Sequence, residues 1–149
     1  MGAREILEFV KIEHTLFSLP FVLIGFVLAD NEFGSEMSDG FWIIFAAVGA
    51  RGLAMALNRI IDREIDAENP RTSSRHLPSG TMSIQAAWVL SGIFLAMLLL
   101  SAWMLNEVAL KMSWLPVAAF VIYPYTKRFS WLCHFWIGFC LALAPAGAW

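Results

Sequence analysis

Five long runs of apolar residues dominate this sequence and restrict it to one kind of surroundings. A helix needs about 20 mostly apolar residues to cross the hydrocarbon core of a bilayer, and somewhat fewer when its ends are polar. Runs of this kind cover residues 15–29, 41–61, 86–105, 110–125 and 131–149. Because they are continuous and lack the two-residue alternation of membrane β-strands, they predict an all-α membrane protein, a helical bundle of about five transmembrane helices.

The composition excludes two other classes of protein. Hydrophobic residues make up 59% of the chain and charged residues only 15%, whereas soluble domains are about 45–50% apolar. Ten Lys and Arg stand against twelve Asp and Glu, which leaves no basic excess for a phosphate backbone. We therefore expect a lipid bilayer around the chain and no nucleic acid as a partner.

The basic residues are distributed unevenly between the loops. Eight of them precede the first run or follow the second and fourth, and one lies in the remaining loops. Lys and Arg in short loops are biased toward the cytoplasm. The N-terminus, the loop at residues 62–83 and the turn at residues 127–130 are therefore predicted to be cytoplasmic.

Polar side chains at the end of the second run are spaced as on one helix face. Asn58, Asp62 and Asp66 follow one another at intervals of four, so a helix turns all three in nearly the same direction. Mg²⁺ prefers one or two carboxylates together with water and phosphate oxygens. The spacing predicts Mg²⁺ ligands that face a diphosphate. The alternative is a solvated helix end whose acidic residues form exposed ion pairs.

Arginines surround these oxygen ligands. They are Arg59, Arg63, Arg71 and Arg75. The planar guanidinium group of an arginine matches the geometry of a phosphate. Arg51 differs because it interrupts an apolar run, where an unpaired charge is costly unless it faces a polar cavity. It contacts either a substrate or backbone carbonyls. Its neighbours Gly49 and Gly52 are expected to allow a second helix to approach closely.

Three sequence motifs resemble one protein family. NRIIDREID at residues 58–66 has the pattern N-x-x-x-D-x-x-x-D and is followed by NPRTSSRHLPSG. The first run opens with K-x-x-H-T-x-F-x-x-P-F from Lys11, and YPYTKR at residues 123–128 has the pattern Y-x-x-x-K before a basic residue. Together they resemble the N-terminal half of the UbiA superfamily of intramembrane prenyltransferases, in its 4-hydroxybenzoate polyprenyltransferase branch.

The resemblance implies a function. Enzymes of this kind depend on Mg²⁺ and transfer a polyprenyl group from polyprenyl diphosphate to an aromatic acid such as 4-hydroxybenzoate. The reaction is a step of ubiquinone or menaquinone biosynthesis. The enzyme would lie in the inner (plasma) membrane of a bacterium. By this resemblance Asp62 and Asp66 are catalytic and, with Asn58, hold the metal. The residues implied in diphosphate binding are Arg63, Tyr123, Lys127 and Arg128, and Arg51 is implied at the carboxylate of the acid.

The chain departs from the family pattern after residue 66. Members of the family carry a second Asp-rich motif, but no aspartate follows Asp66 here. Residues 1–149 are therefore expected to be the N-terminal portion of a single UbiA-like transmembrane domain, truncated at the C-terminus, whose partner is the missing C-terminal half of the same bundle. We expect the isolated chain to be inactive.

Two further hypotheses come from other classes of protein. The first is a non-catalytic membrane half that binds a prenyl diphosphate. The second is a small ion or metabolite transporter with Asp62, Asp66 and Arg51 along its pathway. His14, at the start of an apolar run, is either a proton acceptor or a hydrogen-bonded structural residue.

Overall fold

The computed structural model of the chain describes residues 3–129 and 131–149, and these residues form helices joined by turns and loops. The helices are α1 (Ala3–Val10), α2 (Ile12–Phe33), α3 (Met37–Ile61), α4 (Arg63–Glu68), α5 (Ile84–Leu105), α6 (Glu107–Met112), α7 (Trp114–Phe129) and α8 (Cys133–Ala148). No strand occurs in the described part of the chain. The predicted all-α fold is confirmed.

Four helical segments are long and apolar enough to cross a membrane. They are α2, α3, α5 and the combined segment Glu107–Arg128 of α6 and α7, whereas α8 is apolar but has only 16 residues. The first run is longer than predicted, because α2 continues for several residues beyond each of its expected ends. Ser130, in the predicted turn at residues 127–130, lies outside the described residues.

Two breaks in the helices were not predicted. Lys11 adopts a left-handed conformation with φ of 53°, which separates α1 from α2. Ser113 separates α6 from α7, and Pro116 then falls in the first turn of α7, where a helix needs no amide proton from it. No helix was predicted before Lys11, but the structure folds residues 3–10 into the short amphipathic helix α1.

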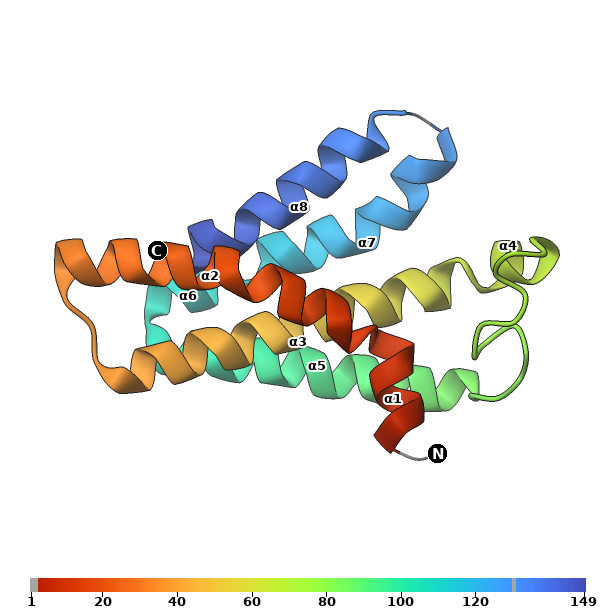
Figure 1. Cartoon of the computed structure of the whole chain (residues 1–149), viewed down its shortest axis with the longest axis horizontal. Helices are drawn as coiled ribbons and strands as arrows, with labels where there is room; N and C mark the ends of the chain where they lie inside the picture. Colours follow the sequence, from red (N-terminus) through yellow and green to blue (C-terminus); the bar gives the residue numbers. More distant parts are fainter. Residues whose placement is uncertain (1–2, 130) are drawn as a thin grey trace.

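The long helices form a ring with one helix outside it. α3 packs against α2 and α7, and α8 closes the ring by packing against both α2 and α7 (Figure 1). α5 packs along the outer side of α3. Many large apolar side chains remain exposed on the outside, among them Phe17, Trp103 and Phe135. Such a surface suits lipid and not water.

All the predicted cytoplasmic segments lie at the same end of the bundle. α1, α4 and the C-terminal end of α7 are on the right in Figure 1, whereas the α2–α3 and α5–α6 turns are on the left. We call the end that carries α1 and α4 the basic end. Phe9 is fully buried there in a cluster with Ala56, Leu77 and Leu90. The sequence therefore predicted correctly which segments share an end.

Glycines allow close packing at two helix crossings. A Cβ atom on Gly52 would overlap the Phe94 ring of α5, and one on Gly49 would lie 3.0 Å from the backbone of Leu98. These contacts confirm the predicted close approach. On α2, a Cβ atom on Gly25 would overlap the backbone carbonyl of Pro145 in α8. Backbone atoms cannot move aside as a flexible side chain can, so the close crossing of α2 and α8 requires a glycine at position 25.

We predict that Gly25→Ala destabilises the bundle by about 1–3 kcal/mol because the added methyl group overpacks the α2–α8 crossing. The matched control is Gly92→Ala on α5, where a Cβ atom meets nothing within 4 Å. There the replacement of glycine within a helix is expected to be neutral or to stabilise by up to about 1 kcal/mol. Thermal unfolding in detergent micelles measures both, and equal melting temperatures would contradict the α2–α8 packing.

Candidate functional site

Asp62 is the centre of a charged cluster at the basic end. It lies at the C-terminal end of α3 and is only 1% exposed. Its carboxylate forms ion pairs with Lys127 and, at 3.1 Å, with Arg128, both in the last turn of α7. Arg128 also donates a hydrogen bond of 3.0 Å to the carbonyl of Ile61. One buried carboxylate therefore ties the ends of α3 and α7 together.

Asp66 lies one helical turn beyond Asp62 and has a different partner. Its amide donates to the Asp62 carbonyl at 2.8 Å, and its carboxylate accepts a hydrogen bond of 2.7 Å from Arg75. Asp66 is 7% exposed. Thr72 donates its hydroxyl proton to the Asp66 carbonyl at 3.0 Å. The loop after α4 is thus folded back so that Arg75 covers the second carboxylate.

Arg59 adds a buried positive charge beside this pair. It is 6% exposed, and its guanidinium lies over the Phe9 ring of α1 at 5.2 Å from the ring centroid. Its Nε atom is buried and has no hydrogen-bond partner among the described residues. Arg59 also interacts electrostatically with Asp66 and Arg75.

The cluster has more cations than carboxylates. Four basic side chains, Lys127, Arg128, Arg75 and Arg59, surround Asp62 and Asp66. Arg59 is buried, whereas the other three side chains are 29–37% exposed. A buried cation that no carboxylate pairs with favours a bound anion. A phosphate group matches the geometry of guanidinium donors. The arrangement can therefore bind and neutralise a phosphorylated ligand.

Arg51 and Tyr123 extend the polar region into the bundle. Arg51 is half-buried on α3, and its Nη2 atom lies 3.3 Å from Nδ1 of His14 on α2. Tyr123 on α7 interacts electrostatically with both Arg51 and Asp62. The ammonium group of Lys127 lies 5.8 Å from the centroid of the Tyr123 ring. Tyr123 is therefore near both the charged cluster and Arg51.

The structure brings most of the predicted site residues together but not all of them. Asn58 is half-buried one turn before Asp62, whose amide donates to the Asn58 carbonyl at 3.0 Å. Arg63 instead forms an exposed ion pair of 3.2 Å with Glu64 and is not part of the cluster. Neither the pairing of Arg75 with Asp66 nor the burial of Arg59 was predicted from the sequence. The helical spacing of Arg59 relative to Asp66 was a usable signal, whereas nothing local predicts the Arg75 contact.

The donor set is suitable for Mg²⁺ but not for a metal held by the protein alone. Among the described residues, no three His, Cys, Asp or Glu side chains gather into a metal-binding group. Two carboxylates and one amide oxygen on adjacent turns match an ion that keeps water and takes phosphate oxygens. Asn58, Asp62 and Asp66 are the residues that would hold it. Both carboxylates are in contact with basic side chains here.

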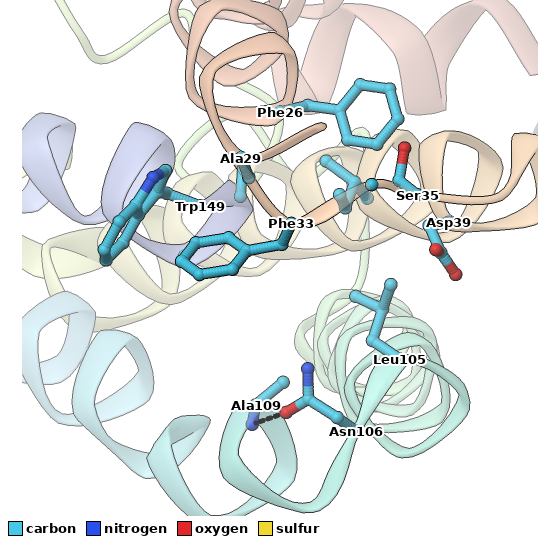
Figure 2. A pocket seen from close by; sticks show the side chains of 13 residues that line it. Phe26, Ala29, Phe33, Ser35, Asp39, Leu105, Asn106, Ala109 and Trp149 are labelled. Atoms are coloured by element: carbon cyan, nitrogen blue, oxygen red, sulfur yellow. Dashed lines mark hydrogen bonds between the residues drawn. The ribbon is translucent and has the colours of Figure 1, made fainter. Parts of the chain in front are cut away.

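A cavity of about 210 Å³ lies at the opposite end of the bundle. Apolar side chains provide much of its wall, including Phe26, Phe33, Leu105 and Trp149 (Figure 2). Asn106 lines it as well and accepts a hydrogen bond of 2.7 Å from the amide of Ala109. The cavity does not include the charged cluster, so the two features are separate.

These features define an integral membrane helical bundle with a cluster of basic and acidic side chains at one end. The sequence pattern of the UbiA prenyltransferase family matches residues 18–149. The chain belongs to the UbiA prenyltransferase family.

Similar proteins share both the sequence and the fold. The 4-hydroxybenzoate octaprenyltransferase of Vibrio atlanticus is 32% identical over 106 residues, which are 71% of this chain and 37% of that protein. The enzyme of the same name from Shewanella sediminis is 36% identical over 98 residues, or 64% and 33%. The apo structure of a UbiA homologue from Aeropyrum pernix K1 superposes with a TM-score of 0.86 at 39% identity and covers 92% of this chain.

The match to longer proteins is partial. A structure described as digeranylgeranylglyceryl phosphate synthase has the same fold, with a TM-score of 0.86 at 22% identity. This chain covers 51% of that structure and 49% of the Aeropyrum pernix structure. It spans about half the length of the solved relatives and less than half of the curated ones.

We predict that Lys127→Met lowers the free energy of unfolding by about 1–3 kcal/mol, because the buried Asp62 loses one charged partner and keeps Arg128. Lys111→Met is the matched control, since Lys111 and Glu107 form an exposed pair with 72% and 86% of their side chains accessible. An exposed pair of this kind contributes about 0.3–0.5 kcal/mol. Unfolding by SDS in mixed micelles gives both values, and equal losses would argue against a buried Asp62.

Proposed function

We propose that this chain forms the diphosphate-binding half of a Mg²⁺-dependent prenyltransferase. The reaction transfers a polyprenyl group from polyprenyl diphosphate to an aromatic acid of the 4-hydroxybenzoate type, as a step of ubiquinone or menaquinone biosynthesis. The observation that carries this proposal is the buried Asp62 carboxylate between Lys127 and Arg128, with the Asp66–Arg75 pair on the next turn. The similarity to the 4-hydroxybenzoate octaprenyltransferases of Vibrio and Shewanella supports the substrate class.

The basic side chains have a defined part in this chemistry. The bond between the allylic carbon and the diphosphate oxygen breaks, and the electron pair leaves with the diphosphate. Lys127, Arg128 and Arg75 stabilise the negative charge that grows on this leaving group, and Tyr123 orients Lys127. The aromatic ring carbon then bonds to the allylic cation and loses its proton. Asn58, Asp62 and Asp66 would hold Mg²⁺, which would supply Lewis-acid stabilisation of the same charge.

Arg51 is proposed to bind the carboxylate of the aromatic acid. It forms no salt bridge within residues 3–129 and 131–149, and its buried Nε–H lacks a hydrogen-bond partner there. A guanidinium binds a carboxylate through two parallel hydrogen bonds, which also orients the acid. Arg63 is the weakest of the proposed diphosphate ligands, since its side chain is paired with Glu64.

The orientation and the second half of the site complete the proposal. The basic end faces the cytoplasm, in the inner membrane of a bacterium, because the basic loops gather there. The second Asp-rich motif of the family is proposed to come from the part of the longer relatives that this chain does not match, since it covers 49% and 51% of the two solved ones.

We predict that Asp62→Asn and Asp66→Asn abolish the Mg²⁺ dependence of geranyl diphosphate binding. For the wild-type chain in detergent, calorimetry should give an affinity at least roughly tenfold higher with Mg²⁺ than without it. Each variant loses a ligand carboxylate and should bind equally with and without the ion. Glu68→Gln removes an exposed carboxylate two residues from Asp66 and should keep the wild-type ratio.

The opposing outcome separates this proposal from a simple ion-pair cluster. If the acidic residues only neutralise the arginines, both Asn variants free basic side chains and bind the diphosphate more tightly whether or not Mg²⁺ is present. A wild-type affinity that does not change with Mg²⁺ would remove the metal assignment.

We also predict that the purified 149-residue chain gives no prenylated product from geranyl diphosphate and 4-hydroxybenzoate. It lacks the carboxylates that a second Asp-rich motif would bring to the other side of the diphosphate. Chromatographic analysis of the reaction with a radiolabelled donor measures this. Product formation by the chain alone would show that one Asp-rich motif is sufficient.

A further inference from the structure

One side-chain contact joins α2 and α3 within the ring. Nη2 of Arg51 lies 3.3 Å from Nδ1 of His14, although the two residues are 37 positions apart in the sequence. Arg51 lies roughly 16 Å before Asp62 along α3, from the 1.5 Å rise per residue of a helix. The contact is therefore distinct from the ion pairs of Asp62 and Asp66.

The chemistry of the two groups determines the direction of this hydrogen bond. A guanidinium carries only N–H donors and has no acceptor. His14 must therefore accept through a lone pair on Nδ1, which requires a neutral imidazole with its proton on Nε2. The alternative tautomer would place two N–H groups against each other. The contact thus specifies the state of His14 as well as its position.

The remaining surroundings of Arg51 leave part of its donor edge available. Its Nε atom is buried without a hydrogen-bond partner among the described residues, and no carboxylate in that part of the chain pairs with it. Tyr123 approaches from α7 but carries no charge that would neutralise it. A cation held on one side by a neutral acceptor and unpaired on another suits a carboxylate ligand.

We propose that His14 is a positioning residue for Arg51. Its neutral imidazole accepts from Nη2 and holds the guanidinium so that the unpaired N–H edge faces the carboxylate of an aromatic acid. This inference rests on the proposed function in assigning that acid to Arg51. It also gives the histidine of the first apolar run a structural partner, one of the two roles that the sequence left open.

A spectroscopic experiment tests the tautomer without any reaction. The chain has three histidines, and the His14→Asn variant identifies the ¹⁵N imidazole signals of His14 in a detergent-solubilised sample. We expect an unprotonated Nδ1 and a protonated Nε2 for His14, with loss of this preference in Arg51→Leu. A protonated Nδ1 in the wild-type protein would overturn the proposal.

A kinetic experiment tests whether His14 positions Arg51. It uses this chain assembled with the proposed C-terminal half that carries the second Asp-rich motif. His14→Ala should raise KM for 4-hydroxybenzoate by roughly tenfold, as for a lost hydrogen bond to a charged group, with kcat and KM for geranyl diphosphate nearly unchanged. His14→Asn should restore the wild-type KM because its amide oxygen occupies the place of Nδ1. His14→Gln should not, since its amide oxygen corresponds to Nε2. His134→Ala on α8 is the control.

Arg51→Leu distinguishes a failure of this inference from a failure of the proposed function. If Arg51→Leu leaves KM for the acid unchanged, the assignment of the acid to Arg51 is wrong, and this inference fails with it. If Arg51→Leu raises that KM but His14→Ala does not, the proposed function stands and the positioning role is wrong.

Discussion

The buried carboxylate of Asp62 is the constraint on which the basic end depends. It lies at the junction of α3 and α4, where it is both the residue after α3 and the residue before α4. α7 also ends at this point. Lys127 and Arg128 stabilise both helix ends and the carboxylate, and Arg128 satisfies the carbonyl of Ile61 that α3 leaves without a partner. Ion pairs as well as side-chain packing therefore hold α3 against α7, a contact that helps to close the ring.

The features predicted from sequence are those that local periodicity determines. The apolar runs predicted the membrane helices, and four-residue spacing placed Asp62 and Asp66 on adjacent turns. Gly49 and Gly52 were predicted at a helix crossing because small side chains permit close approach. In each case the information lies within a few turns of one helix, so no knowledge of the tertiary structure is needed.

The features that were missed depend on contacts between distant segments or on single backbone angles. Arg75 reaches Asp66 only because an irregular loop folds back, and no spacing rule predicts its course. The left-handed Lys11 is a single non-glycine residue in an uncommon conformation, so the helix before it could not be separated from the first apolar run. Arg63 has the same charge as the basic residues of the cluster, but its side chain on α4 pairs with Glu64 instead.

The short helix α1 affects the charged cluster through one apolar contact. Phe9 covers Arg59 and separates it from water, and the strength of an electrostatic interaction rises as the local dielectric constant falls. An apolar residue near the N-terminus thereby sets how strongly a guanidinium acts on the second carboxylate. Loosening α1 would hydrate Arg59 and weaken its field while every charged residue stayed in place. By keeping water from Arg59, the N-terminal segment strengthens the electrostatic interactions within the charged cluster.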